Sequence, residues 1–195
     1  MEWNFIFFFN SILLGVGLAM DAFSVSLANG LNEPCMSKKK TLSIAGIFGV
    51  FQGLMPMIGW ICVHTLLQYF NAFEKFIPWI ALILLVFIGG KMLIDGIKNK
   101  EEDVCAKPGI TLGALLVQGV ATSIDALSVG FTIAEHTFIM ALVSVALIAI
   151  VTFFISLLGL FLGKKFGTKL SNKAAILGGV ILIIIGIEIF ITGII

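Results

Sequence analysis

The chain has 195 residues, of which 59% are hydrophobic and only 12% are charged. Soluble domains carry about 25% charged residues, so this composition excludes an ordinary soluble globular protein. All twelve basic residues are lysines and the net charge is +1. The chain therefore lacks the arginine side chains and the large positive charge that favour nucleic-acid binding.

Six apolar stretches are each long enough to cross a bilayer, which takes about 20 residues of helix. In chain order they cover about residues 5–29, 42–68, 77–97, 110–133, 138–163 and 174–194. None alternates polar and apolar residues as a membrane β-strand does. The first stretch is too long for a signal peptide and follows Glu2 instead of a basic segment, so we expect it to be retained. We predict an all-α membrane protein with six transmembrane helices, a single integral membrane domain over residues 1–195.

Lysine placement predicts the orientation of these helices. One side of the membrane receives the links between spans 1 and 2, 3 and 4, and 5 and 6, which hold Lys38, Lys39, Lys40, Lys98, Lys100, Lys107, Lys164, Lys165, Lys169 and Lys173. The links on the opposite side hold only Lys75. Because cytoplasmic loops carry the lysine excess, we expect both termini to lie outside.

The chain also contains an internal repeat. AMDAFSVSLANG at residues 19–30 is similar to TSIDALSVGFT at 122–132, which places Asp21 and Asp125 at corresponding positions. In the same order, residues 48–59 match 148–159, which pairs Gln52 with Thr152, and residues 88–97 match 185–194. Three helices per copy reverse the second copy in the membrane. We therefore predict two inverted three-helix repeats, about 1–98 and 108–195, a common plan among secondary transporters.

The two aspartates are the most costly residues in these spans. A carboxylate at the bilayer centre costs roughly 2.5–3.5 kcal/mol on insertion scales and usually faces the bundle interior along an ion or proton path. Ser24 and Ser128 each follow an aspartate by three residues and share its helix face. We expect Asp21 and Asp125 to meet at one site; the structural alternative is that each caps a broken helix or bonds across helices.

Two further residues are candidates for the same site. Pro56 has no N–H, so the carbonyl of Gln52 loses its helical hydrogen bond, and the Gln52 amide adds a second oxygen. A proline kink used only for packing fits this pattern equally well. Glu188 is another acidic residue inside a predicted span, near its outer end. It either relays an ion or proton or simply reaches the interface.

The predicted ligands are oxygens, and we expect no basic side chain at their depth. Such sets suit hard divalent cations such as magnesium, calcium or manganese. Cys35, Cys62 and Cys105 are too widely spaced to predict a thiolate metal site, and we expect small apolar or loop thiols there. His64 and His136 fall near span ends, where we expect interfacial side chains.

Five segments resemble the MntP family of manganese efflux pumps, within the LysE-like exporter superfamily: AMDAFSVSLANG, FGVFQGLMPMIGW, FIGGKMLIDG, ATSIDALSVGFT and AAILGGVILIIIGIEI. They preserve the motif order over nearly the whole chain. The resemblance implies six helices and manganese export across the bacterial cell membrane. It also implies that Asp21 and Asp125 are the paired intramembrane aspartates, and Gln52 lies in the matching second-span motif.

The leading hypothesis is a secondary exporter that holds Mn(II) between Asp21 and Asp125. Ser24, Ser128 and Gln52 would add neutral oxygens, with Glu188 as a further acidic candidate, and alternating access with proton exchange would move the ion. The metal is the substrate, and we expect no cofactor; GxxxxGK[ST] is absent, so we expect no P-loop nucleotide. The alternatives are another divalent cation or a small cationic organic solute such as an amino acid. An intramembrane aspartyl enzyme is less favoured, and we expect no enzyme; a purely structural membrane protein is less favoured still, because the costly charges are duplicated. Metal selectivity and oligomeric state stay open.

Overall fold

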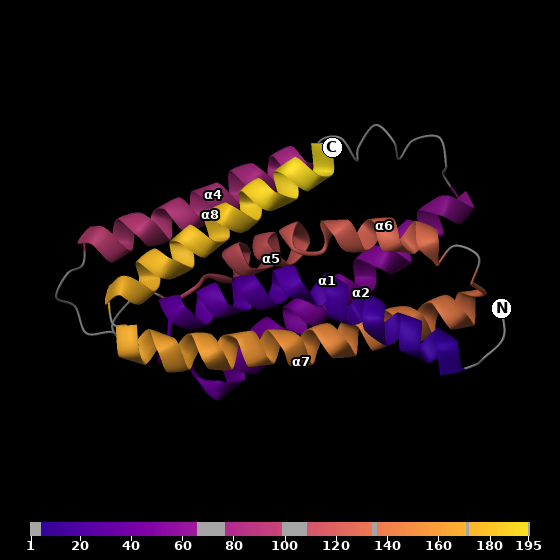
Figure 1. Ribbon diagram of the computed structural model, residues 1–195, viewed down its shortest axis with the longest axis horizontal. Coiled ribbons are helices and arrows are strands. Elements are labelled where there is room, and N and C mark those ends of the chain that lie inside the picture. The colour runs from indigo at the N-terminus through magenta and orange to yellow at the C-terminus, as the bar shows by residue number, and fades with distance from the viewer. Residues whose placement is uncertain (1–4, 66–76, 99–108, 134–135, 171, 195) are drawn as a thin grey trace.

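The computed structural model describes residues 5–65, 77–98, 109–133, 136–170 and 172–194, and all structural statements below concern these residues. They form helices and short connections, without strands (Figure 1). The helices are α1 (Phe5–Asn32), α2 (Lys38–Thr65), α4 (Ile77–Lys98), α5 (Leu112–Ala121), α6 (Ile124–Thr132), α7 (Phe138–Leu170) and α8 (Asn172–Ile194). Each of the six predicted spans therefore coincides with a helix or, for 110–133, with the pair α5 and α6.

The break between α5 and α6 is the one departure from the predicted helices. The two helices meet at 44°. The Thr122 hydroxyl donates to the carbonyl of Gln118 at 2.9 Å, and the Ser123 hydroxyl donates to the carbonyl of Gly119 at 2.7 Å. The Ser123 hydroxyl thus bonds the Gly119 carbonyl that the Ser123 N–H would use in a continuing helix, and that N–H bonds the Val120 carbonyl at 3.1 Å instead. The Thr122 N–H still bonds the Gln118 carbonyl at 2.9 Å.

Helices α1 and α7 lie side by side and run in the same direction, as Figure 1 shows. The Ser11 and Ser144 hydroxyls are hydrogen-bonded at 3.0 Å near one end of the pair. Near the other end, a Cβ added to Gly30 would lie 2.6 Å from the carbonyl oxygen of Leu160 and 2.9 Å from Gly163 Cα. No larger side chain fits at Gly30 unless the helices separate, so small residues determine this close approach.

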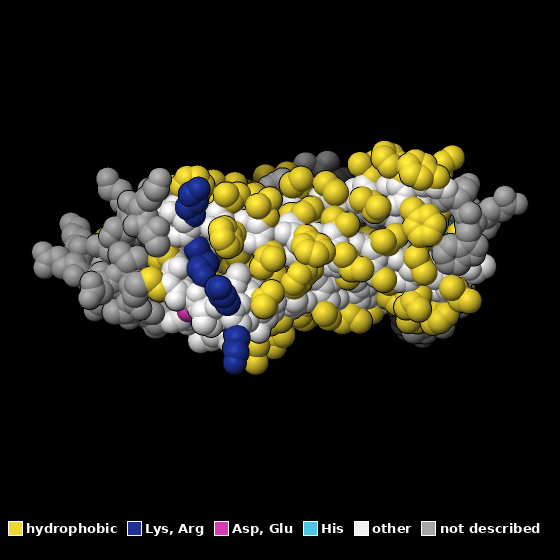
Figure 2. Space-filling view, turned by 90° about the horizontal axis from the view of Figure 1, so that it is seen from below, with side chains coloured by type: hydrophobic (Ala, Val, Ile, Leu, Met, Phe, Trp, Pro, Cys, Tyr) yellow, Lys and Arg dark blue, Asp and Glu magenta, His cyan; other side chains and the backbone are white. Residues whose placement is uncertain are grey.

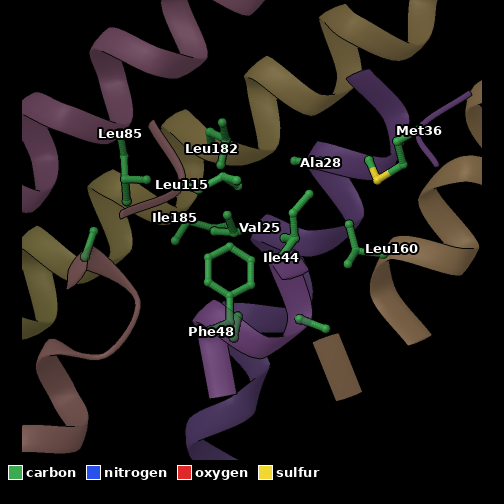
Figure 3. Packing of buried hydrophobic residues seen from close by; sticks show 13 residues of the cluster. Val25, Ala28, Met36, Ile44, Phe48, Leu85, Leu115, Leu160, Leu182 and Ile185 are labelled. Carbon is green, nitrogen blue, oxygen red and sulfur yellow. The ribbon is translucent and has the colours of Figure 1, made fainter. Parts of the chain in front are cut away.

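The remaining helices pair in a regular pattern. α2 packs against both α6 and α7, α4 packs along α8, and α8 also contacts α1. A buried apolar cluster joins six of the seven described helices (Figure 3). Its members include Val25, Ile44, Phe48, Leu85, Leu115, Leu160 and Leu182. The two halves of the sequence consequently share one core.

The exterior suits a lipid environment. Large apolar side chains are exposed along the whole length, including Phe87 at 71% and Phe161 at 69%, and Figure 2 shows them covering one long face. Within the described part of the chain, α1, α2 and α7 contain membrane-length apolar segments, and the bent pair α5–α6 gives a fourth. The protein is therefore an all-helical membrane protein; the crossings by α4 and α8 stay predictions.

One end of the molecule is rich in lysine. Lysine side chains lie in a row across one end of the apolar face in Figure 2. Helix α2 begins at this end with Lys38–Lys40, and Lys164 near the end of α7 donates to the carbonyl of Met36 at 2.7 Å. Glu33 forms an ion pair with Lys40 at 2.6 Å and accepts a hydrogen bond from the Ile110 N–H at 3.0 Å. We call this end the lysine-rich face.

The structure corrects one expectation about the cysteines. Cys35, expected to be a loop thiol, is disulfide-bonded. Cys62 in α2 is a free thiol, as expected.

Candidate functional site

The two aspartates come from different kinds of helix. Asp21 lies in the middle of the continuous helix α1 and is half-buried. Asp125 lies in the first turn of α6, directly after the break, and its carboxylate accepts a hydrogen bond from the Ala126 N–H. A carboxylate at this position is also stabilised by the positive end of the helix dipole.

The structure places the two carboxyl groups within range of each other's charge. The charge of Asp21 acts on Asp125. The Asp125 side chain is accessible, yet surrounding protein removes part of the water from its carboxyl group. Two like charges in such a place repel each other, and a cation between them would offset the repulsion.

A hydrogen-bonded amide pair gives the relative register of α1 and the α5–α6 pair. Asn29 Nδ2 donates to Gln118 Oε1 at 2.8 Å, and Gln118 Nε2 donates to Asn29 Oδ1 at 3.2 Å. Asn29 follows Asp21 by eight residues, and Gln118 precedes Asp125 by seven. The two helices run in opposite directions, and each helix rises about 1.5 Å per residue. Each aspartate therefore lies about 10–12 Å along its helix from the amide pair, in the same direction, so the two aspartates lie at the same level.

A cavity of about 680 Å³ lies on the other side of this level, away from the lysine-rich face. It is lined by the first half of α1, the end of α6, and His136 and Ser144 near the start of α7. Gly17 lines it one turn before Asp21, and Val129 lines it one turn after Asp125. Each aspartate therefore lies on the same helix face as a residue that lines the cavity, one turn farther from the cavity.

Gln52 lies close to Asp21 but differs in part from the expectation. It is fully buried, and its Nε2 donates to the carbonyl of Leu18 at 2.5 Å, one turn before Asp21. Its Oε1 is buried and has no hydrogen-bond partner among the described residues. The same holds for the hydroxyl of Thr152, which the predicted repeat pairs with Gln52. Each of these two buried oxygens is therefore available to a ligand.

The structure shows less about the other predicted site residues. Ser24 is half-buried and Ser128 is exposed, each on the helix face of its aspartate. The side chain of Glu188 is outside the described residues, although its backbone belongs to α8. Across the described part of the chain, no three His, Cys, Asp or Glu side chains form a cluster suited to a metal. A metal at this site would therefore have two carboxylates and neutral oxygens as ligands.

Sequence reasoning missed one feature of the site, and it gave the other, a broken helix at Asp125, only as the structural alternative. The pairing of Asn29 with Gln118 joins residues 89 positions apart, and only the polar character of each side chain inside an apolar span pointed to it. The break before Asp125 did have a local signal, the adjacent hydroxyls of Thr122 and Ser123.

Comparison with known families identifies the chain. A sequence profile described as "Putative manganese efflux pump" matches residues 35–190. The chain belongs to this MntP family. The match covers most of the chain and includes Asp125, whereas Asp21 lies before its first residue.

Similar proteins extend the match to the N-terminal region. The protein named "Putative manganese efflux pump MntP" from Ruminiclostridium cellulolyticum is 44% identical over 180 residues, covering 92% of this chain and 93% of its own length. Proteins of the same name from Rippkaea orientalis and Clostridium perfringens are 43% and 40% identical, over 95% and 94% of this chain and 97% and 95% of their own lengths. No solved structure matches the chain.

Proposed function

We propose that this MntP-family protein exports Mn(II) from the cytosol across the plasma membrane of a bacterium. The relatives carry manganese efflux in their names. One observation supports the proposal most: two carboxylates on different helices lie within range of each other's charge, one turn from residues that line a cavity. A pair of like charges partly shielded from water suits a cation, and oxygen ligands suit manganese.

In the proposed mechanism Mn(II) binds between Asp21 and Asp125. The unused Oε1 of Gln52 offers a neutral oxygen, and the hydroxyls of Ser24 and Ser128 are available on the same helix faces. Glu188 is kept as a further acidic candidate. Protons that replace the metal on the carboxylates would drive exchange, because a carboxylate must lose its proton to bind a metal.

We further propose that the two inverted repeats alternate access to this site. In the proposed repeats, α1 corresponds to α6 and α2 corresponds to α7. The contact between α1 and α7 therefore corresponds to the contact between α6 and α2, and both contacts are present. At equivalent crossings, a Cβ on Gly159 would lie 3.1 Å from Ser26 Cβ, and a Cβ on Gly59 would lie 3.1 Å from Gly130 Cα. These paired contacts support rocking of two similar units around a shared site.

The proposed orientation puts the lysine-rich face in the cytosol. The lysine excess in short loops supports it. The disulfide at Cys35 lies at the same face, and disulfides are rare in the cytosol, so the two features favour opposite sides. We give the lysines more weight because several separate loops carry them.

The test measures manganese resistance and cellular manganese in a strain without the gene. Wild type should restore resistance, whereas Asp21→Asn and Asp125→Asn should each lose it while inserting normally, because a neutral amide cannot offset the charge of the ion. Glu101→Gln, in the predicted 98–107 link, is the matched control and should keep resistance. Resistance in both asparagine variants would contradict the proposed site.

A second candidate substrate is a small organic cation, such as an amino acid. The cavity of about 680 Å³ is large enough for one. Export assays in everted vesicles separate the two substrates. Asp-dependent uptake of a labelled amino acid, without uptake of manganese, would favour the organic cation.

A further inference from the structure

We propose that Asn29 and Gln118 form the barrier between the paired aspartates and the lysine-rich face, and that this pair must separate for the ion to enter. The inference rests on the proposed function because it assigns a role to residues along the same path. Neither residue belongs to the proposed metal ligands.

The first step concerns the position of the pair. Both side chains are fully buried, and each carboxamide donates to the other. The pair lies two turns from the aspartates on the side of the lysine-rich face. The cavity lies on the opposite side and ends one turn from the aspartates. In this conformation the site is therefore close to a cavity on one side and closed by the amide pair on the other.

The second step concerns what else could close the path. α1 packs closely against α7 and α8, and α5 and α6 pack against α2; α1 makes no comparably close helix packing with α5 or α6. The two long amide side chains span the space between these helices. Residue Glu33, after the end of α1, also holds the chain before α5 through the Ile110 N–H. The buried apolar cluster, with Val25 of α1 and Leu115 of α5, packs around the amide pair. The closure is thus made of side-chain contacts that can be exchanged, of which the amide pair is the polar part, whereas glycine contacts join the backbones of α1 and α7.

The third step comes from the repeat. The offset of 104 residues that relates Asp21 to Asp125 also relates Asn29 to Ile133 and Leu14 to Gln118. Leu14 and Ile133 both line the open cavity. The closed polar pair therefore corresponds to an apolar pair at the open end. In inverted repeats, the opposite conformation exchanges the two ends, so Leu14 and Ile133 would come together when Asn29 and Gln118 separate.

The chemistry of the pair suits this role. Carboxamides carry no charge, so a closed pair satisfies its own donors and acceptors without needing an ion. Once the pair separates, both side-chain oxygens are free to coordinate a partly dehydrated divalent cation on its way to the aspartates. The break at Thr122–Ser123 provides a hinge at the end of the helix that carries Gln118.

The experiment measures access to the space between the barrier and the aspartates. Ser24→Cys, between Asp21 and Asn29 on α1, is introduced after Cys35, Cys62 and Cys105 are replaced by serine. A membrane-impermeant cationic methanethiosulfonate is applied to inside-out or right-side-out vesicles. We expect slow labelling from the lysine-rich face and faster labelling through the cavity. Asn29→Ala or Gln118→Ala should speed labelling from the lysine-rich face at least tenfold.

Two controls separate a barrier from general loosening. Ser144→Ala removes a buried hydrogen bond between helices at the opposite end and should leave labelling from the lysine-rich face unchanged. The exchanged pair Asn29→Gln with Gln118→Asn keeps both carboxamides and should restore slow labelling.

Three results would overturn the barrier: equal labelling of the unaltered pair from both faces, no acceleration in either alanine variant, or the same acceleration in Ser144→Ala. The labelling uses no manganese. Failure of the barrier is therefore distinguishable from failure of manganese export, which the resistance assay reports.

Discussion

Helix α1 and the pair α5–α6 carry the two similar aspartate segments but cross the molecule differently. α1 is one helix of 28 residues, whereas α5 and α6 are separate helices of 10 and 9 residues that meet at 44°. Where α5–α6 has Thr122 and Ser123, α1 has Leu18 and Ala19. The comparison shows that two similar sequences around an aspartate form a continuous helix in one place and a broken helix in the other, and that they differ at the two residues just before the aspartate's own turn.

The rigidity of α1 comes from its neighbours as well as from its own sequence. Glycines let α7 approach its backbone along several turns, and the Leu18 carbonyl accepts the amide of Gln52. The carbonyls of Gln118 and Gly119, near the end of α5, instead receive hydroxyls from their own chain. Asp21 is thus fixed by another helix, and Asp125 is placed by a local break.

The largest expected effect is on the close contact between α1 and α7. Gly30→Ala places a Cβ against the backbone of α7, and such overpacking costs about 1–3 kcal/mol. Gly46→Ala in α2 is the matched control, because a Cβ there meets nothing within 4 Å and alanine favours a helix. Unfolding in mixed detergent micelles measures both. Equal stability of the two variants would mean that the α1–α7 contact is looser than described.

The next effect is on the hinge. Replacing Thr122 by Val and Ser123 by Ala removes the hydroxyls that hold the α5 carbonyls, so the helix should straighten and turn Asp125 away from Asp21. Loss of a positioning contact typically lowers metal affinity about 10- to 100-fold. Manganese binding to purified protein measures it. Thr41→Val, which removes a similar hydroxyl-to-carbonyl bond inside the continuous helix α2, should leave binding unchanged; an equal loss there would make the hinge explanation wrong.

The smallest effect is on the contact between Gln52 and α1. Gln52→Leu removes the hydrogen bond to the Leu18 carbonyl, which is worth about 0.5–1.5 kcal/mol, and it also removes the unused Oε1. Gln52→Glu keeps an oxygen at that place. Detergent unfolding reports the hydrogen bond, and manganese binding reports the oxygen. Unchanged manganese binding in Gln52→Leu would exclude Gln52 as a ligand.

Most of the fold could be predicted because a membrane span needs an apolar segment of a certain length. The predicted segments 5–29 and 77–97 end within a few residues of α1 and α4. The break at Thr122 was expected only as an alternative because the same type of bond occurs without a break: the Ser11 hydroxyl donates to the carbonyl of Phe7 inside α1. Whether a helix stops there depends on the packing of both pieces, which a short motif does not contain.

The site was predicted in part, for a related reason. Repetition of the costly residues Asp21 and Asp125 was enough to expect a shared site, which stays a prediction; the charge of Asp21 reaches Asp125. The partner of Gln118 was not predictable, since it depends on the register between helices distant in sequence. Gln52 was expected as a ligand because Pro56 frees its carbonyl. In the structure, the side-chain amide nitrogen of Gln52 donates to the carbonyl of Leu18 in α1. This hydrogen bond depends on which carbonyl lies beside Gln52, and the sequence does not show that.

The one-sided closure that contains Asn29 and Gln118 has an electrical consequence. In the proposed orientation, a cavity filled with water and open to the exterior is close to the exterior potential, so most of the transmembrane voltage falls across the closed segment between the aspartates and the lysine-rich face. Moving a divalent ion outward against an interior-negative potential costs about 4.6 kcal/mol per 100 mV, at roughly 2.3 kcal/mol per elementary charge. Most of that work is done in passing this closed segment, and returning two protons per ion would cancel the net charge movement.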